Sequence, residues 1–283
     1  MPYMTFADGT ANLPSSLLDG ITLLPCGYTV DDVPQVYDGD IDSFDGETYY
    51  NELRQGKIVK TSLLNTELFL ENFTPCLEKG LDVIYVSMSS GISGTFQSAK
   101  MAAEELMDKF RDRVVRIIDS HGCGFGNGIL AIRSAELAKK GLTATEVADI
   151  LDEEVPHTCQ YFTVDDLNFL KRTGRVSGAS AMIGSVLNIK PILYGNHDGF
   201  IVSCEKVRGR KKAIEALAAK YAQKVSDTVE HIVAISHGDC LADANELAEK
   251  IKAIADPKRL VICQHEPFSG AHVGPGMLGL FFY

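Results

Sequence analysis

The fold is decided by the stretch VIYVSMSSGISGTFQSAKMAAEELMDKF, residues 83–110. Its first four residues are β-branched or aromatic and predict a buried strand. Small polar residues follow, and apolar residues then recur at helical spacing from Phe96 to Phe110. The unit is a strand, a Ser/Gly loop and a helix, which puts the loop where open α/β sheets bind ligands. The helix start offers unpaired N–H groups and a positive dipole end, so a carboxylate or a phosphate would fit there.

Ser93 is the candidate site residue of this loop. Serine is also a favoured helix N-cap, so a purely structural role for Ser93 stays open. The spacing disfavours two catalytic motifs. A nucleophile elbow needs glycine where Thr95 stands, and no Gly-Lys-Ser/Thr follows at the distance that a P-loop requires.

The composition is that of an ordinary globular chain with an acidic balance. The 283 residues are 45% hydrophobic and 23% charged, and the formal net charge of −11 argues against a nucleic-acid-binding protein. No apolar run approaches the ~20 residues of a membrane span, and the first residues predict no signal peptide. The seven cysteines are scattered without C-x-x-C or zinc spacing, so we expect reduced thiols, no bound metal and a cytoplasmic location.

Strand and helix patterns alternate through residue 155 and predict a mainly parallel sheet covered by helices. Beyond residue 157, the apolar runs 189–194 and 200–207 flank a glycine-bounded loop and predict a hairpin, hence a mixed sheet. We therefore predict two α/β domains, residues 1–157 and 158–283, with a ligand cleft between them.

Three local features give further predictions. Residues 31–45 carry six aspartates and are expected to form an exposed loop. The glycines that follow Asp119 are expected to let the next helix pack close to a strand. Asp165 is expected to cap a helix with Leu167 and Leu170 facing inward.

Seven segments together carry a resemblance to a known family. They are Lys60-Thr61-Ser62, SSGISGTFQSA (89–99), Ile118-Asp119-Ser120, FTVDDLNFLKRTGRVS (162–177), IKPIL (189–193), KVRGRKKA (206–213) and HVGPGMLGLFF (272–282). In this order they resemble the DegV family of bacterial fatty-acid-binding proteins. The chain departs from the family at Asp8-Gly9-Thr10, where relatives usually have Asp-Ser-Thr, and at Leu63-Leu64-Asn65, where they often have Gln-Pro.

The resemblance implies two α/β domains with a long-chain fatty acid in a buried tunnel between them. It implies that the carboxylate is held by Thr61, Ser62, Ser93, Gly94 and His272. Characterised relatives present the acid to a separate ATP-binding kinase subunit, which yields an acyl phosphate for phospholipid synthesis. It follows that this chain would be a carrier subunit with no catalytic residue, cofactor or metal of its own, and with at most transient membrane contact.

A basic island stands out in the acidic chain, because residues 171–212 hold nine Lys or Arg against two acids. We expect it to rim the head-group end and to dock the kinase partner, although such a run can also be a solvated face. The expected rim residues are Lys171, Arg172, Arg175, Arg208 and Arg210. Candidates for the tunnel lining, which could equally be ordinary core, are Leu167, Phe169, Met182, Ile183, Val186 and Leu187.

Two other classes of function remain open on the sequence. One is an enzyme, either a hydrolase or half of a small-molecule kinase that uses Ser93 and His272. The other is a structural or regulatory protein with an empty cleft.

Overall fold

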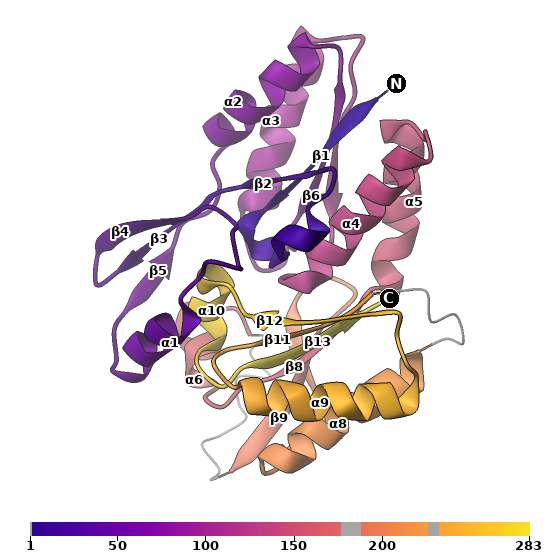
Figure 1. Ribbon diagram of the computed structural model, residues 1–283. Coiled ribbons are helices and arrows are strands. Elements are labelled where there is room, and N and C mark those ends of the chain that lie inside the picture. Colours follow the sequence, from indigo (N-terminus) through magenta and orange to yellow (C-terminus); the bar gives the residue numbers. More distant parts are fainter. Residues whose placement is uncertain (1, 177–187, 226–231) are drawn as a thin grey trace.

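The computed structural model describes residues 2–176, 188–225 and 232–283, which form an α/β structure with three sheets (Figure 1). The tunnel candidates Met182, Ile183, Val186 and Leu187 lie outside the described residues. Short 3₁₀ helices occur at Gly9–Ala11, Ser15–Leu17 and Val155–His157.

The first sheet, sheet A, is parallel and carries the stretch that decides the fold. Its strand order is β2-β1-β6-β7, and the run Val83–Val86 in β6 is fully buried, as predicted. Helices α2 and α3 cover one face, and α4 and α5 cover the other (Figure 1). The bounds are β1 Tyr3–Asp8, β2 Ile21–Leu24, β6 Asp82–Ser87, β7 Val115–Asp119, α2 Thr66–Glu78, α3 Thr95–Lys109, α4 Phe125–Lys139 and α5 Ala144–Glu154.

The glycine-rich start of α4 packs closely on its neighbours. A Cβ atom on Gly128 would lie 2.5 Å from the carbonyl oxygen of Ala11 and 2.9 Å from Leu13. Gly124, at the N-cap, has a φ of 63°, a conformation that favours glycine. The absence of side chains here therefore brings α4 against the segment that follows β1.

The second sheet, sheet B, is small and antiparallel, with the order β4-β3-β5. The prediction of a loop over 31–45 is wrong in part, because Val33–Tyr37 pairs with β3 as an edge strand, although four of its five residues are exposed as expected. Asp45 caps the helix that follows, since its carboxylate accepts from the Thr48 amide at 3.0 Å. The bounds are β3 Cys26–Val30, β4 Val33–Tyr37, β5 Val59–Thr61 and α1 Gly46–Arg54.

The third sheet, sheet C, is mixed, as predicted, with the order β10-β9-β8-β13-β11-β12. The predicted hairpin is β9 with β10, and only the pair β11–β12 among the described strands of this sheet is parallel. Helices α8 and α9 cover its outer face. The bounds are β8 Cys159–Thr163, β9 Ile189–Gly195, β10 Ile201–Arg208, β11 Ile232–His237, β12 Arg259–Gln264, β13 Leu278–Phe282, α6 Asn168–Thr173, α8 Arg210–Lys224, α9 Leu241–Ile254 and α10 Pro267–Val273.

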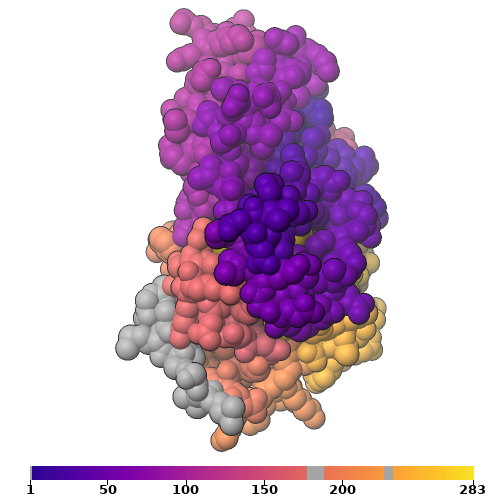
Figure 2. Space-filling view, turned by 90° about the vertical axis from the view of Figure 1, so that its left-hand side faces the viewer, coloured from indigo at the N-terminus to yellow at the C-terminus, as the bar shows by residue number. Residues whose placement is uncertain are grey.

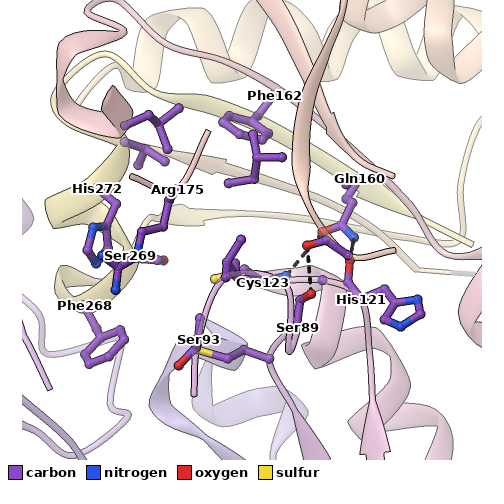
Figure 3. A pocket seen from close by; sticks show the side chains of 18 of the residues that line it. Ser89, Ser93, His121, Cys123, Gln160, Phe162, Arg175, Phe268, Ser269 and His272 are labelled. Atoms are coloured by element: carbon purple, nitrogen blue, oxygen red, sulfur yellow. Dashed lines mark hydrogen bonds between the residues drawn. The ribbon is translucent and has the colours of Figure 1, made fainter. Parts of the chain in front are cut away.

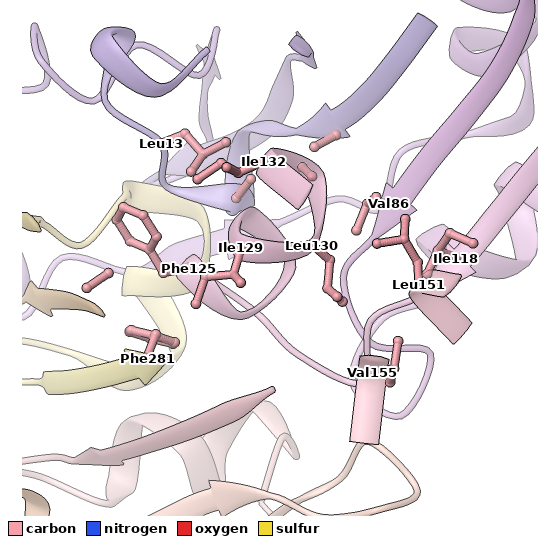
Figure 4. Packing of buried hydrophobic residues seen from close by; sticks show 14 of the residues in the cluster. Leu13, Val86, Ile118, Phe125, Ile129, Leu130, Ile132, Leu151, Val155 and Phe281 are labelled. Atoms are coloured by element: carbon pink, nitrogen blue, oxygen red, sulfur yellow. The ribbon is translucent and has the colours of Figure 1, made fainter. Parts of the chain in front are cut away.

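The inner face of sheet C, opposite α8 and α9, packs against α4 of the first part. The rings of Phe125 on α4 and Phe281 on β13 lie 6.4 Å apart, and both belong to one buried cluster that also contains Val86 and Leu151 (Figure 4). The side view shows the two parts in direct contact, with indigo to magenta residues above salmon to yellow ones (Figure 2). The division at residues 157 and 158 stays a prediction, because this core is shared.

All seven cysteines are free thiols, as the scattered spacing predicted. Among the described residues, no helix is long and apolar enough to cross a membrane.

Candidate functional site

The described residues enclose a cavity of about 240 Å³ between the Ser/Gly loop, α10 and the inner face of sheet C (Figure 3). His272 and Phe268 lie at one end, which we call the head-group end, and Gln160 and His121 lie at the other. Its apolar lining consists mainly of Leu63, Met88, Ile92, Phe162, Leu170, Ile201, Phe268, Val273, Met277 and Phe281. Its polar lining includes Thr61, Ser89, Ser93, His121, Gln160, Arg175, His265, Ser269 and His272.

The head-group end brings together three of the residues singled out in the sequence. Thr61 ends β5, and its Oγ1 lies 3.0 Å from Nε2 of His272 on α10. The other ring nitrogen of His272, Nδ1, is buried and has no hydrogen-bond partner among the described residues. The side chain of Arg175 lines the same cavity. The end therefore holds an unsatisfied imidazole nitrogen beside a hydroxyl and a guanidinium.

Ser93 lies one residue before the N-cap of α3, which is Gly94, and both residues line the cavity. Its Oγ donates to Thr95 Oγ1 at 3.0 Å and accepts from the Thr95 amide at 3.2 Å. The helix has no side-chain bond from its N-cap, so Ser93 supports the helix start from the preceding position. Ser93 therefore both supports the start of α3 and lines the cavity.

Ser62 does not line the cavity in the part of the chain that is described. Its side chain is exposed, and its amide donates to the Gly27 carbonyl at 3.2 Å. The segment Leu63-Leu64-Asn65, where the chain departs from the family pattern, follows Ser62 directly. Leu63 lines the cavity, and Asn65 caps α2 by accepting from the Leu68 amide at 3.0 Å.

The expected basic rim divides into two groups. Arg172 and Arg175 act on His272 electrostatically, and Arg172 stacks on the Phe169 ring at 4.2 Å. Lys171 lies beside Arg172 on α6, whereas Arg208 ends β10. Arg210 begins α8 and pairs with Asp243 at 2.8 Å, so its charge is compensated.

The prediction that Asp165 caps α6 is wrong. Asp166 accepts from the Asn168 amide at 2.9 Å, while the Asp165 carboxylate lies 2.6 Å from Lys190 Nζ and 3.6 Å from Arg210. These cations come from β9 and α8, so only the tertiary structure could reveal them. The buried Leu170 does face inward, as predicted.

A buried polar network supports α10 beneath His272. His265 Nε2 lies 2.8 Å from Ser269 Oγ, and His265 Nδ1 lies 3.0 Å from Ser236 Oγ. Glu266 caps α10 by accepting from the amides of Phe268 and Ser269. Burial raises the pKa of Glu266 to about 7. These residues were not predicted from the sequence, because an isolated His-Glu pair gives no local signal of its partners.

The charge state at the head-group end is set by burial. Burial, aided by Arg175 and Arg172, lowers the pKa of His272 to about 4, so its imidazole is neutral near pH 7. A neutral imidazole has one N–H, which can serve a ligand or Thr61. Together with two hydroxyls and Arg175, it suits an anionic head group. Among the described residues, no three His, Cys, Asp or Glu side chains cluster as metal ligands would.

These pKa shifts predict acid destabilisation. Burial lowers the pKa of His265 to about 3, and His272 is lowered to about 4, whereas both would titrate near 6.5 in the unfolded chain. The unfolded state therefore binds more protons as the pH falls below 6.5, and the free energy of unfolding decreases by up to about 1.4 kcal/mol per pH unit for each histidine. Glu266 acts in the opposite direction, because its raised pKa favours the folded state at low pH and this contribution is lost toward pH 7.

We expect His272→Gln to flatten this pH dependence by about one proton. Urea unfolding at pH 4.5, 5.5 and 6.5 measures the slope. The control is His197→Gln, the same substitution at a histidine whose side chain is 88% exposed. If the unfolding free energy of His272→Gln depends on pH as steeply as that of the parent, the lowered pKa of His272 is contradicted.

Comparison with known proteins gives one family over nearly the whole chain. The sequence model of the "Uncharacterised protein, DegV family" matches residues 5–283. A DegV domain-containing protein of Clostridium perfringens is 34% identical over 281 residues, which cover 99% of this chain and 97% of that protein.

Solved structures agree with the sequence comparison. A fatty-acid-binding DegV family protein from Thermus thermophilus superposes with a TM-score of 0.89 at 26% identity, covering 100% of this chain and 99% of the other. DegV of Bacillus subtilis, a fatty acid binding protein, superposes with a TM-score of 0.85 at 28% identity, with the same coverage. With a family match over residues 5–283 and this shared fold, the chain belongs to the DegV family.

Proposed function

We propose that this chain binds one long-chain fatty acid in the cavity, with the carboxylate at Thr61, Ser93, Gly94 and His272. The observation that carries the proposal is a single cavity with a mainly apolar lining that holds Thr61, His272 and Arg175 together at one end. A buried carboxylate needs hydrogen-bond donors, which the head-group end supplies. A dozen buried methylenes would contribute about 10 kcal/mol before the cost of association. The fatty acid binding of the Thermus and Bacillus relatives supports the same ligand class.

Native mass spectrometry of the purified protein tests the proposal. We expect the intact protein to carry one fatty acid, and the delipidated protein to regain one when oleic or palmitic acid is added. A protein that carries no lipid and takes up neither acid would contradict fatty acid binding.

We further infer that the chain is a carrier without catalytic residues or a cofactor of its own, acting in the bacterial cytoplasm. A separate ATP-dependent kinase subunit would bind to it. The fatty acid carboxylate would attack the γ-phosphorus of ATP, the bond to ADP would break, and the resulting acyl phosphate would enter phospholipid synthesis. The absence of a P-loop motif from the sequence is compatible with an ATP site on the partner. The hydrolase alternative has less support, because among the described hydrogen bonds Ser93 pairs with Thr95 and His272 with Thr61.

Arg172 offers the sharpest test of partner docking. It is exposed on α6 and near the head-group end, so we expect Arg172→Glu to reduce acyl phosphate formation at least tenfold through lost electrostatic attraction. Fatty acid content should stay at the parent level in native mass spectra. Arg175 is unsuitable for this test because it lines the cavity.

The control for Arg172→Glu is Lys100→Glu, a charge reversal at an exposed position of α3. It should leave acyl phosphate formation unchanged. Equal losses in both variants would mean that total charge matters and not a docking site at α6.

A further inference from the structure

A groove lies directly behind the end of the cavity that is farthest from His272. Its volume is about 440 Å³, and it shares three lining residues with the cavity: His121, Gln160 and Gly195. Its other walls include Phe96, Ile117, Val155, Pro156, Tyr161 and Tyr194. The wall of the groove is mixed, because these apolar side chains stand beside the polar and charged residues Asp119, Asp152, Asn196, His197 and Lys224. A thin wall of shared residues separates the groove from the cavity.

The centre of this wall is the side chain of Gln160, which reaches from β8 of sheet C to the loop after β7 of sheet A. Its Nε2 donates to the His121 carbonyl at 2.8 Å, and its Oε1 accepts from the Cys123 amide at 3.3 Å (Figure 3). Both ends of the amide are thus hydrogen-bonded within the protein. A satisfied amide can face an apolar ligand without leaving a buried polar group unpaired.

Three glycines from two parts of the fold form a close seat for this amide. A Cβ atom on Gly126 would lie 2.7 Å from Gln160 Oε1, and one on Gly195 would lie 2.8 Å from Nε2. A Cβ on Gly122 would also meet Nε2, at 3.0 Å. The side chain is therefore held tightly and cannot swing aside into these positions.

We propose that Gln160 is the end wall that sets the length of the acyl chain, and that the groove behind it is an unused extension of the cavity. This inference rests on the proposed function, with the carboxylate at His272 and the methyl end pointing toward Gln160. A chain that just reaches the wall buries all of its methylenes. A longer chain must buckle or displace a hydrogen-bonded side chain, so further methylenes lower the affinity.

The proposal is tested by measuring the affinities of saturated fatty acids of 12 to 22 carbons. The delipidated parent is compared with the delipidated Gln160→Ala protein. The parent should show an optimum length and a loss of affinity beyond it. Removing the amide should join the cavity to the groove and shift the optimum by about two to four carbons. Because a buried methylene is worth about fourfold in affinity, the preference for the longer acid should rise at least tenfold.

The matched variant is Gln160→Met, which keeps the length of the side chain but loses its hydrogen bonds. It should keep the parent's optimum, since the wall is still filled. If the optimum chain length shifts as far in Gln160→Met as in Gln160→Ala, the end-wall proposal is wrong. The hydrogen bonds of Gln160, and not its volume, would then set the preference.

A second measurement needs no substitution. A fatty acid with a diazirine at its methyl end should label peptides that contain His121, Gln160 or Gly195 in the parent protein after irradiation. Labelling confined to other peptides would overturn the proposal. If the parent binds the acids but Gln160→Ala keeps the parent's optimum chain length, the end-wall proposal is wrong and the proposed function stands. If the parent binds none of them, the proposed function fails, and the end wall falls with it.

Discussion

Ser93→Ala is expected to weaken the binding of a long-chain fatty acid about ten- to a hundredfold while the protein stays folded. The expected loss is that of one hydrogen bond to a charged group, about 1.5–3 kcal/mol. Ser93 has a single O–H, which it donates to Thr95 Oγ1, so this hydroxyl must turn from Thr95 to donate to a carboxylate at the cavity wall. It can still accept from the Thr95 amide in that position. The start of α3 adds favourable dipole interaction with the same anion, and this contribution should survive the substitution.

Thr61→Ala and His272→Ala should give losses of similar size, because the two side chains share one hydrogen bond at the head-group end. The double variant should lose less than the sum of the single variants, since removing either partner already frees the other. His272→Ala has a second permitted outcome, in which the lipid stays bound but is no longer positioned for phosphoryl transfer.

Ser62→Ala is the matched control for these three variants. Ser62 is adjacent to Thr61 and carries the same kind of hydroxyl, but it is exposed and lies off the cavity wall. Titration of delipidated protein with a fluorescent fatty acid gives the affinities, and circular dichroism checks the fold. If Thr61→Ala, Ser93→Ala and His272→Ala all bind fatty acid and support the kinase as Ser62→Ala does, the head group lies elsewhere.

Gly128→Val should give the largest loss of stability, about 3 kcal/mol. Its Cβ would lie 2.5 Å from the Ala11 carbonyl oxygen and 2.9 Å from Leu13, and the backbone atom cannot move aside as a side-chain end can. Helix α4 packs on both sheet A and sheet C, so a shift of this helix would disturb the core on both sides. The midpoint of urea unfolding measures the loss.

Gly27→Val is the control for this substitution. A Cβ at Gly27 meets nothing within 4 Å, and valine suits the strand that Gly27 occupies. Its stability should equal or exceed that of the parent. A Gly128→Val protein as stable as the Gly27→Val protein would show that α4 has room to move.

Much of the fold could be predicted from the sequence because local patterns report which side of an element is buried. The run Val83–Val86 predicted a buried strand, and helical spacing after Thr95 predicted α3 to within a residue or two. The parallel sheet A and the mixed sheet C followed from the order of such patterns. In contrast, the strand β4 was missed because an edge strand with four exposed residues has no apolar alternation to detect.

The candidate site was predicted only as a set of separate residues, and the resemblance to the DegV family joined them. Thr61 and His272 are 211 positions apart, so their contact depends on how α10 packs against β5. Asp165 pairs with Lys190 and Arg210 for the same reason.

The position of Gln160 at the cavity could not be predicted from the sequence. Its hydrogen bonds and its seat of glycines come from loops on other elements. Periodicity determined which elements this chain forms, because burial repeats along each one. The tertiary structure alone decided which polar side chains meet, because contacts between distant segments leave no local pattern.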